Sequence, residues 1–191
     1  LNGGTVRNCS FVGSVCLVTD TTYGQNVGGL IGEIGGGTTV ENCYVIADGA
    51  VSAPNTAAWI GGLFANADGF SGVTVISNCY AACRLSNRAR DGSNYVGAIG
   101  AIVFSGATVS DCYAQSDYIV VEAVEQRNFN GTLLPKADLQ SADGIVPALN
   151  EVIEKNLNTA LYSWVLDPTQ NGGYPDFGAT VWFENGMDGE K

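Results

Sequence analysis

The chain contains no histidine among its 191 residues. A Ser-His-Asp triad, a histidine general base and an HExxH zinc site are therefore excluded within this chain. The cysteines do not form CxxC pairs, so a cysteine-only zinc site lacks its usual spacing. We expect no catalytic residues, no metal and no cofactor, and any catalysis would have to depend on carboxylates.

Positive charge is also scarce, because eight Lys and Arg residues stand against nineteen Asp and Glu residues and leave a net charge of −11. The sequence offers no basic patch for nucleic acid or anionic lipid, so we expect no nucleic-acid partner. It has no apolar run of about eighteen residues, so we expect no membrane insertion by this chain. The sequence begins inside a repeated phrase, so we expect it to be part of a larger protein whose targeting signals lie outside it.

A short phrase with a central cysteine occurs four times, and consecutive cysteines are 34, 36 and 33 residues apart. A second phrase, rich in glycine, follows the same period, and its glycines allow close backbone approach or positive φ at a tight turn. Periods of this length are typical of stacked repeat proteins. The cysteine phrases cover residues 5–10, 39–44, 75–80 and 108–113, and the glycine phrases cover residues 27–32, 60–65 and 96–101.

Strict alternation of inward and outward side chains fails within the cysteine phrase. A corner at Asn42 restores it, because Val40 and Cys43 then both point inward. Asparagine tolerates the left-handed backbone of such a corner better than other non-glycine residues. Stacking of the copies predicts two ladders of side chains. The corner ladder is Asn8, Asn42, Asn78 and Asp111, and the inward ladder is Cys9, Cys43, Cys79 and Cys112.

The residue after each of the last three ladder cysteines points outward and is a tyrosine: Tyr44, Tyr80 and Tyr113. These rings either stack between neighbouring repeats or form a contact surface for a sugar or a protein. The ladder cysteines are expected to stay reduced as small apolar core residues. Disulfides are the alternative, because the six cysteines are an even number.

The repeat stops near Phe129, and the rest of the chain has a different pattern. Ser141–Leu157 has apolar residues at helical spacing, with Ser141 as the expected N-cap. Residues 161–166 and 180–183 have the composition of strands. A repeat stack exposes an apolar end and an unpaired strand edge, so we expect this part to cap the stack.

The sequence therefore predicts an all-β fold with a small α/β cap. Residues 1–128 are expected to form about four coils of a β-solenoid that resembles a right-handed parallel β-helix. Residues 129–191 are expected to form the C-terminal capping segment, with one helix and short strands.

Gly29-Leu30-Ile31-Gly32 resembles the GLUG motif of bacterial surface proteins, among them large IgA-cleaving metallopeptidases and adhesin-like proteins of gut Bacteroidetes. Residues 62–65 and 98–101 keep the motif in weakened form, and Asn171–Pro175 after Trp164 is similar to the closing segment of such proteins. The resemblance implies a β-solenoid that is secreted or at the cell surface. It carries over no catalytic residues, because the peptidase members keep their zinc site in a separate domain.

We predict a non-enzymatic extracellular repeat module of a bacterial surface protein. Its role would be adhesion, spacing or display, with a host glycan or an extracellular protein as partner. The alternative is a carbohydrate-active or glycan-binding β-helix, which would place acidic residues on one face. The candidate binding residues are Tyr44, Tyr80, Tyr113, Arg88 and Asp91.

Overall fold

The structure is a computed structural model, which describes residues 1–16, 25–53, 58–87, 95–117, 119–121, 130–156 and 161–180. Within these ranges β-strands make up most of the chain, and the two α-helices come after all but the last two strands. The strands are β1 (Asn2–Arg7), β2 (Ser10–Val12), β3 (Val15–Cys16), β4 (Gln25–Gly28), β5 (Ile31–Glu41), β6 (Tyr44–Ala53), β7 (Ala58–Gly61), β8 (Phe64–Ala67), β9 (Thr74–Ser77), β10 (Tyr80–Asn87), β11 (Tyr95–Gly97), β12 (Gly100–Val103), β13 (Ala107–Ser110), β14 (Tyr113–Gln115), β15 (Ile119–Val121), β16 (Thr132–Leu134), β17 (Tyr162–Val165) and β18 (Asp176–Thr180). The helices are α1 (Lys136–Leu139), α2 (Ile145–Lys155) and the 3₁₀ turn η1 (Asn171–Gly173).

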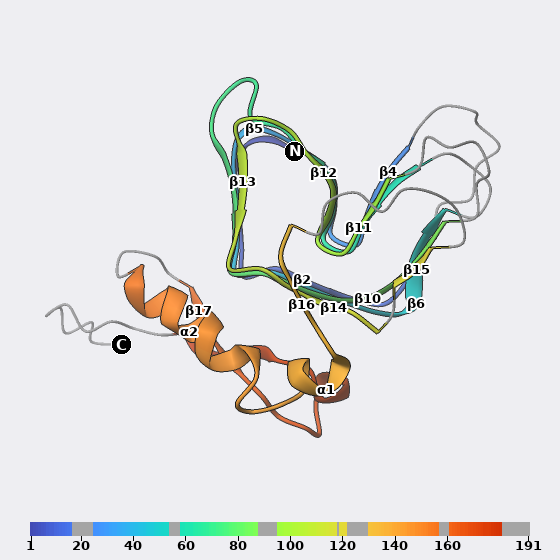
Figure 1. Cartoon of the computed structure of the whole chain (residues 1–191). Coiled ribbons are helices and arrows are strands. Elements are labelled where there is room, and N and C mark those ends of the chain that lie inside the picture. Colours follow the sequence, from blue (N-terminus) through green and yellow to red (C-terminus); the bar gives the residue numbers. More distant parts are fainter. Residues whose placement is uncertain are drawn as a thin grey trace, which may run out of the picture.

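Strands from successive repeats lie beside one another in parallel sheets. One sheet has the order β12-β8-β5-β9-β13 with β1 beside β5, a second has the order β16-β14-β10-β6-β2, and a third has the order β11-β7-β4. Tyr80 pairs with Tyr44 on one side and with Tyr113 on the other, so equivalent residues of neighbouring repeats are in register. In Figure 1 the ribbons of successive repeats therefore overlie one another around the same outline. The fold is mainly β with parallel sheets, and the sheets nearly close around their core.

The repeated glycine phrase forms the tight turn between two sheets. A Cβ at Gly28 would lie 1.9 Å from the carbonyl oxygen of Ile31, and one at Gly61 would lie 1.6 Å from that of Phe64. Real side chains do not fit at such distances, so the turn needs glycine for close backbone approach. The recurrence of glycine at these positions thus follows from the geometry of the turn.

The inward side chains of the sheets form one hydrophobic core. Val40 and Ile76 before the corner, and Cys43 and Cys79 after it, are completely buried. These are the inward positions that the sequence predicts. The same core contains Val45, Val51, Ile60, Leu63, Phe64, Leu85 and Ile99.

The helix α2 is shorter than the sequence indicates. It begins at Ile145, and Gly144 occupies the N-cap position, where a Cβ would lie 1.9 Å from the carbonyl oxygen of Asp138. Ser141 is therefore not the N-cap, which corrects the prediction. The backbone N–H of Gly144 donates instead to the carbonyl oxygen of Ser141 (3.0 Å). The preceding single turn α1 was not predicted.

The C-terminal segment lies against the outer face of the seven-stranded sheet, below β2, β14 and β10 in Figure 1. A second apolar cluster forms there, in which Leu149 and Trp164 pack with Tyr44 and Tyr80. The sequence predicts a cover over the end of the stack, whereas the structure shows a cover on its side. The outward tyrosines explain the difference, because they supply an apolar surface that the end cap would not cover.

The strand β16 also differs from the expected division of the chain near residue 128. Its residues pair in parallel with β14, Thr132 opposite Tyr113, so it continues the sheet by one strand. Of the two strands expected in the segment, β17 lies within residues 161–166 and is antiparallel to β18. The second expected strand, residues 180–183, falls almost entirely outside the described residues.

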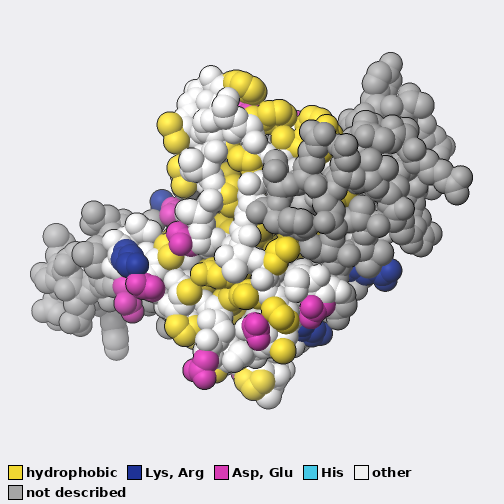
Figure 2. Space-filling model, viewed as in Figure 1, with side chains coloured by type: hydrophobic (Ala, Val, Ile, Leu, Met, Phe, Trp, Pro, Cys, Tyr) yellow, Lys and Arg dark blue, Asp and Glu magenta, His cyan; other side chains and the backbone are white. Residues whose placement is uncertain are grey.

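Charged side chains are sparse on the described surface. The Lys and Arg side chains on the face in Figure 2 lie apart from one another and form no basic patch there. Arg7 forms an ion pair with Glu41 between neighbouring strands, and Lys155 Nζ lies 2.7 Å from Glu151 Oε1 on α2. None of the helices that the structure describes is long and apolar enough to cross a membrane.

Candidate functional site

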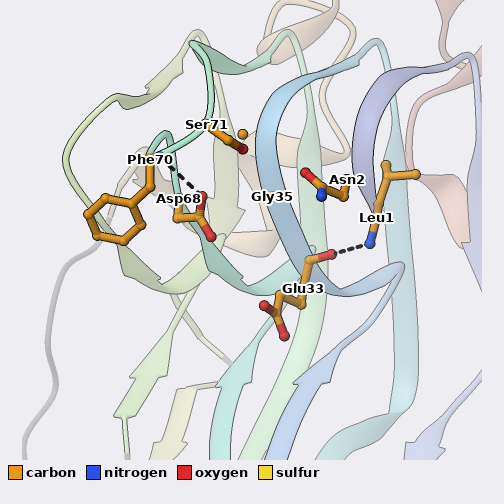
Figure 3. A pocket seen from close by; sticks show the side chains of 8 residues that line it. Leu1, Asn2, Glu33, Gly35, Asp68, Phe70 and Ser71 are labelled. Atoms are coloured by element: carbon orange, nitrogen blue, oxygen red, sulfur yellow. Dashed lines mark hydrogen bonds between the residues drawn. The ribbon is translucent and has the colours of Figure 1, made fainter.

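An open pocket of about 360 Å³ lies beside the middle of β5 and the turn that follows β8. It crosses three neighbouring chain segments: in Figure 3, Leu1 and Asn2 lie on one side of β5, and Asp68 and Phe70 lie on the other. The pocket is lined by Leu1, Asn2, Glu33, Gly35, Gly36, Asp68, Phe70 and Ser71.

Glycines form part of the pocket wall. A Cβ at Gly35 would lie 2.8 Å from Asn2 Oδ1, and one at Gly36 would lie 2.6 Å from Ser71 Oγ. Larger residues would therefore displace the polar side chains around the pocket.

Two carboxylates in the pocket are held by local hydrogen bonds. Asn26 Nδ2 donates to Glu33 Oε2 (3.1 Å). The backbone N–H of Phe70 donates to Asp68 Oδ1 (3.3 Å), and the backbone N–H of Asp68 donates to the carbonyl oxygen of Ile34 (2.9 Å). The pocket thus presents oriented acceptors, together with an amide and a hydroxyl group.

Aromatic rings extend from this pocket along the surface. Phe70 is 76% exposed, whereas Phe104, Trp59 and Tyr95 are half-buried. The ring centroids are 6.0 Å apart from Phe70 to Phe104, 6.3 Å from Phe104 to Trp59 and 5.9 Å from Trp59 to Tyr95. We call these four residues the aromatic row. In Figure 2 hydrophobic side chains are visible along the upper edge of the molecule, where the strands β5 and β12 turn.

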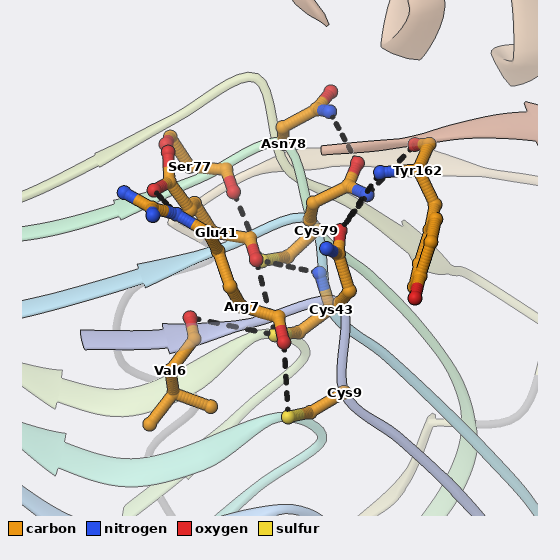
Figure 4. A network of polar contacts seen from close by, with 11 residues as sticks. Val6, Arg7, Cys9, Glu41, Cys43, Ser77, Asn78, Cys79 and Tyr162 are labelled. Carbon is orange, nitrogen blue, oxygen red and sulfur yellow. Dashed lines mark hydrogen bonds and ion pairs between the residues drawn. The ribbon is translucent and has the colours of Figure 1, made fainter. Parts of the chain in front are cut away.

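The corner residues have the left-handed backbone that the sequence predicts, with φ values of 50° at Asn8, 54° at Asn42 and Asn78, and 50° at Asp111. Asn42 Nδ2 donates to Asn8 Oδ1 (2.7 Å), and Asn78 Nδ2 donates to Asn42 Oδ1 (2.8 Å), as Figure 4 shows. The side-chain amides therefore form a ladder across three repeats.

The C-terminal segment attaches to this ladder through the backbone of Tyr162. Its N–H donates to Asn8 Oδ1 (3.0 Å), and its carbonyl oxygen accepts a second hydrogen bond from Asn42 Nδ2 (2.9 Å). At the other end, Asn78 Oδ1 is buried and accepts no hydrogen bond from the described residues. The next corner residue is Asp111, and a carboxylate has no hydrogen to donate to this oxygen.

The cysteine ladder lies directly inside the corner. Cys43, Cys79 and Cys112 are buried and Cys9 is half-buried, and all described cysteines are free thiols. Each ladder thiol lies within 3.0 to 3.2 Å of the carbonyl oxygen two residues before it. Burial raises the pKa of the Cys79 thiol, which disfavours its reactive thiolate, whereas hydrogen bonding with Cys79 lowers the pKa of the Cys43 thiol. The geometry is that of core packing.

The tyrosine row points out of the repeat core but not into solvent. Tyr44 is 3% exposed and Tyr80 is 0% exposed, and their rings stack with centroids 5.1 Å apart and planes at 2°. Trp164 and Phe177 cover them, with centroids 5.9 and 5.1 Å from that of Tyr44. Tyr113 is half-buried at the edge of the same cluster.

Both buried tyrosines bind the C-terminal segment through their hydroxyl groups. Tyr44 donates to Asp176 Oδ1 (2.7 Å), and Tyr80 donates to the carbonyl oxygen of Pro175. Burial first, and then the hydrogen bond to Asp176, raises the pKa of Tyr44 to about 12. A sugar cannot reach these two rings, so the row as a whole is not a binding platform, which corrects that interpretation.

The remaining predicted site residues, Arg88 and Asp91, lie outside the described residues. Among the residues that the structure describes, no group of three or more Cys, Asp or Glu side chains is arranged to hold a metal ion.

Sequence reasoning missed the pocket and the aromatic row. The residues that form them differ from one repeat to the next. The backbone N–H of Phe104 donates to the carbonyl oxygen of Ala67, and that of Asp68 donates to the carbonyl oxygen of Ile34. Gly35, Asp68 and Phe104 therefore occupy equivalent positions in successive repeats. The signal was thus present as variation at one position of an otherwise regular repeat.

Comparisons with known proteins agree with the resemblance to a motif family. Residues 23–51 match the family model described as the GLUG motif, and this stretch contains β4, β5 and the corner at Asn42. The resemblance to the GLUG motif is therefore confirmed over these residues. No curated protein gives a significant match.

The fold is similar to that of a solved structure from Bacteroides ovatus, which is described as a putative immunoglobulin A1 protease. The two chains are 22% identical, with a TM-score of 0.51, and the alignment covers 91% of this chain and 57% of the other. The chain thus spans little more than half the length of that protein. At this identity the likeness concerns the fold alone.

Proposed function

We propose that the chain is a non-enzymatic extracellular module of a larger bacterial surface protein, in which a right-handed β-solenoid serves adhesion, spacing or display. The observation that carries the proposal is the register of the repeats, in which Ser10, Tyr44, Tyr80, Tyr113 and Thr132 are successive neighbours across one sheet. Such stacks are elongated and rigid, and they expose variable turns along their length. These are useful properties in a module that presents a surface away from a cell.

Three further observations support this proposal. The chain is strongly acidic, with a net charge of −11, which favours a dissolved module over one bound to polyanions. The conspicuous cysteines, asparagines and tyrosines of the repeat are used in packing and hydrogen bonding within the fold. The similar solved structure is described as a putative immunoglobulin A1 protease, and this chain aligns with only part of it.

Antibodies raised against the purified chain test the location. We expect them to label intact cells of the source bacterium, and protease treatment of those cells should remove the label. Labelling only after the cells are permeabilised would contradict the proposal.

A carbohydrate-active enzyme is the second candidate, because Glu33 and Asp68 line the same pocket. Glycosidases use a pair of carboxylates on either side of the scissile bond. Release of reducing ends from oligosaccharides by the purified chain, and its loss in Glu33→Gln, would favour this candidate. We expect no release.

A further inference from the structure

The aromatic row and the pocket meet at Phe70, whose ring is one of the most exposed large apolar side chains of the described surface. An exposed phenylalanine gains nothing from the hydrophobic effect in the free protein. Here its ring also contacts Phe104, which fixes one side and leaves the other accessible. Apolar surface of this kind, bordered by polar groups, is typical of an interaction site.

The polar part of the pocket places hydrogen-bond acceptors on one side of this ring (Figure 3). Glu33 and Asp68 contribute carboxylates, and Asn2 contributes an amide. Both carboxylates already have an N–H donor on one oxygen, which orients the remaining lone pairs. The site therefore fits a ligand that has many hydroxyl donors and an apolar face.

Pyranose sugars have both of these properties, because their C–H groups form apolar ring faces and their hydroxyl groups lie around the edge. The volume of about 360 Å³ lies at the lower end of the range for small-molecule sites. Further sugar units could extend from Phe70 along Phe104 and Trp59. Phosphates, uronic acids and sulfated sugars fit poorly, because two carboxylates line the pocket against the single ammonium group of Leu1 and the whole chain is acidic.

We infer that this surface binds a neutral oligosaccharide, with a pyranose ring stacked on Phe70 and its hydroxyl groups donating to Glu33 and Asp68. This inference deepens the adhesion role within the proposed function and rests on that function for its biological setting. It names a ligand class and a surface that differ from the buried tyrosine row. The binding itself can be measured on the isolated chain, whatever the location of the parent protein.

The test measures binding of the 191-residue chain to immobilised cellohexaose, mannohexaose, xylohexaose and chitohexaose, with hexagalacturonate as the anionic comparison. Hits are then titrated by calorimetry. Phe70→Ala should weaken binding by about tenfold, which corresponds to about 1.4 kcal/mol, because it truncates the aromatic anchor of the site. Asp68→Asn should also weaken it, because the amide replaces one acceptor oxygen by a donor.

Two control variants carry matched changes away from the pocket. Val12→Ala removes another exposed apolar side chain, and Asp143→Asn neutralises another exposed carboxylate. Both should bind like the wild type, and all four variants should keep the wild-type urea midpoint. Asp68 is half-buried and Phe70 is exposed, so the urea midpoint shows whether each variant keeps its fold, and loss of binding with an unchanged midpoint would support the inference.

Absence of binding to every neutral oligosaccharide would overturn the inference, and so would equal weakening in the control variants or a preference for hexagalacturonate. These outcomes leave the proposed location intact. Conversely, an intracellular parent protein would refute the proposed function without changing the measured affinity. Binding accompanied by hydrolysis would support the site and refute the non-enzymatic role.

Discussion

Replacing Asp111 with asparagine tests the amide ladder at the corner. The side-chain hydrogen bonds run from Asn42 to Asn8 (2.7 Å) and from Asn78 to Asn42 (2.8 Å). They end at Asn78, because the fourth corner residue is Asp111 and not an asparagine. Asn78 Oδ1 is buried there and accepts no hydrogen bond from the described part of the chain. An asparagine at position 111 would place its Nδ2 where the next donor of the ladder belongs.

The expected gain follows from the cost of the unpaired oxygen. A new intramolecular hydrogen bond contributes about 1 kcal/mol net, and satisfying a buried acceptor adds to this. The backbone needs no change, since φ at Asp111 is already 50° and asparagine accepts this conformation equally well. We therefore expect Asp111→Asn to raise the free energy of unfolding by about 1 kcal/mol. For a chain of this size, the melting temperature should rise by about 2–4 °C.

Urea unfolding provides the assay and compares the wild type with Asp111→Asn, Asn78→Gly and the variant that carries both changes. Asp111→Gly serves as the control, because it removes the carboxylate at the same backbone conformation without adding a donor. The gain from Asp111→Asn should disappear when residue 78 is glycine. Equal stability of Asp111→Asn and the wild type, or a gain that persists without the Asn78 side chain, would refute the reasoning.

Three further predictions concern the turn and the C-terminal segment. Gly61→Ala should lower the free energy of unfolding by roughly 3 kcal/mol or more in urea unfolding. Gly32→Ala should lower it far less, because its Cβ would lie 3.1 Å from the carbonyl oxygen of Asn26. Equal losses of stability in the two variants would contradict the turn geometry. Trp164→Ala should lower the stability of the C-terminal segment by about 3–5 kcal/mol. Amide hydrogen exchange should become faster in β17 and β18, whereas that of β5 should stay slow. The raised pKa of Tyr44 means that the unfolded chain loses this proton first, so stability should fall as pH rises from 10 towards about 12. Urea midpoints in this window should fall less steeply for Tyr44→Phe, and an identical slope would contradict the assignment.

The repeat core could be predicted because its constraints are local and recur. The failure of alternation around Asn42 identifies a corner, and the corner then assigns the inward position of Cys43. The structure has both, with φ of 54° at Asn42 and complete burial of Cys43. The same pattern occurs in every copy, so the corner and the inward position that are inferred for one repeat apply to all of them.

The covering of the tyrosines could not be predicted in the same way. Alternation correctly places Tyr44 and Tyr80 on the outer face, but an outward ring can face solvent or another part of the chain. The choice depends on where residues 136–180 lie, and no repeat period specifies that position. The pocket was missed for a related reason, since it forms where turns of unequal length from neighbouring repeats meet.

Scalar couplings across hydrogen bonds, measured by NMR on the labelled chain, test the central claim that successive repeats stack in parallel register. The structure predicts couplings from the amide nitrogen after each corner to the carbonyl carbon one repeat earlier, across N···O distances of 2.9 to 3.1 Å. The expected pairs are Tyr44 with Cys9, Tyr80 with Cys43, and Tyr113 with Cys79. Couplings that instead join strands within one repeat, as in antiparallel hairpins, would contradict the account.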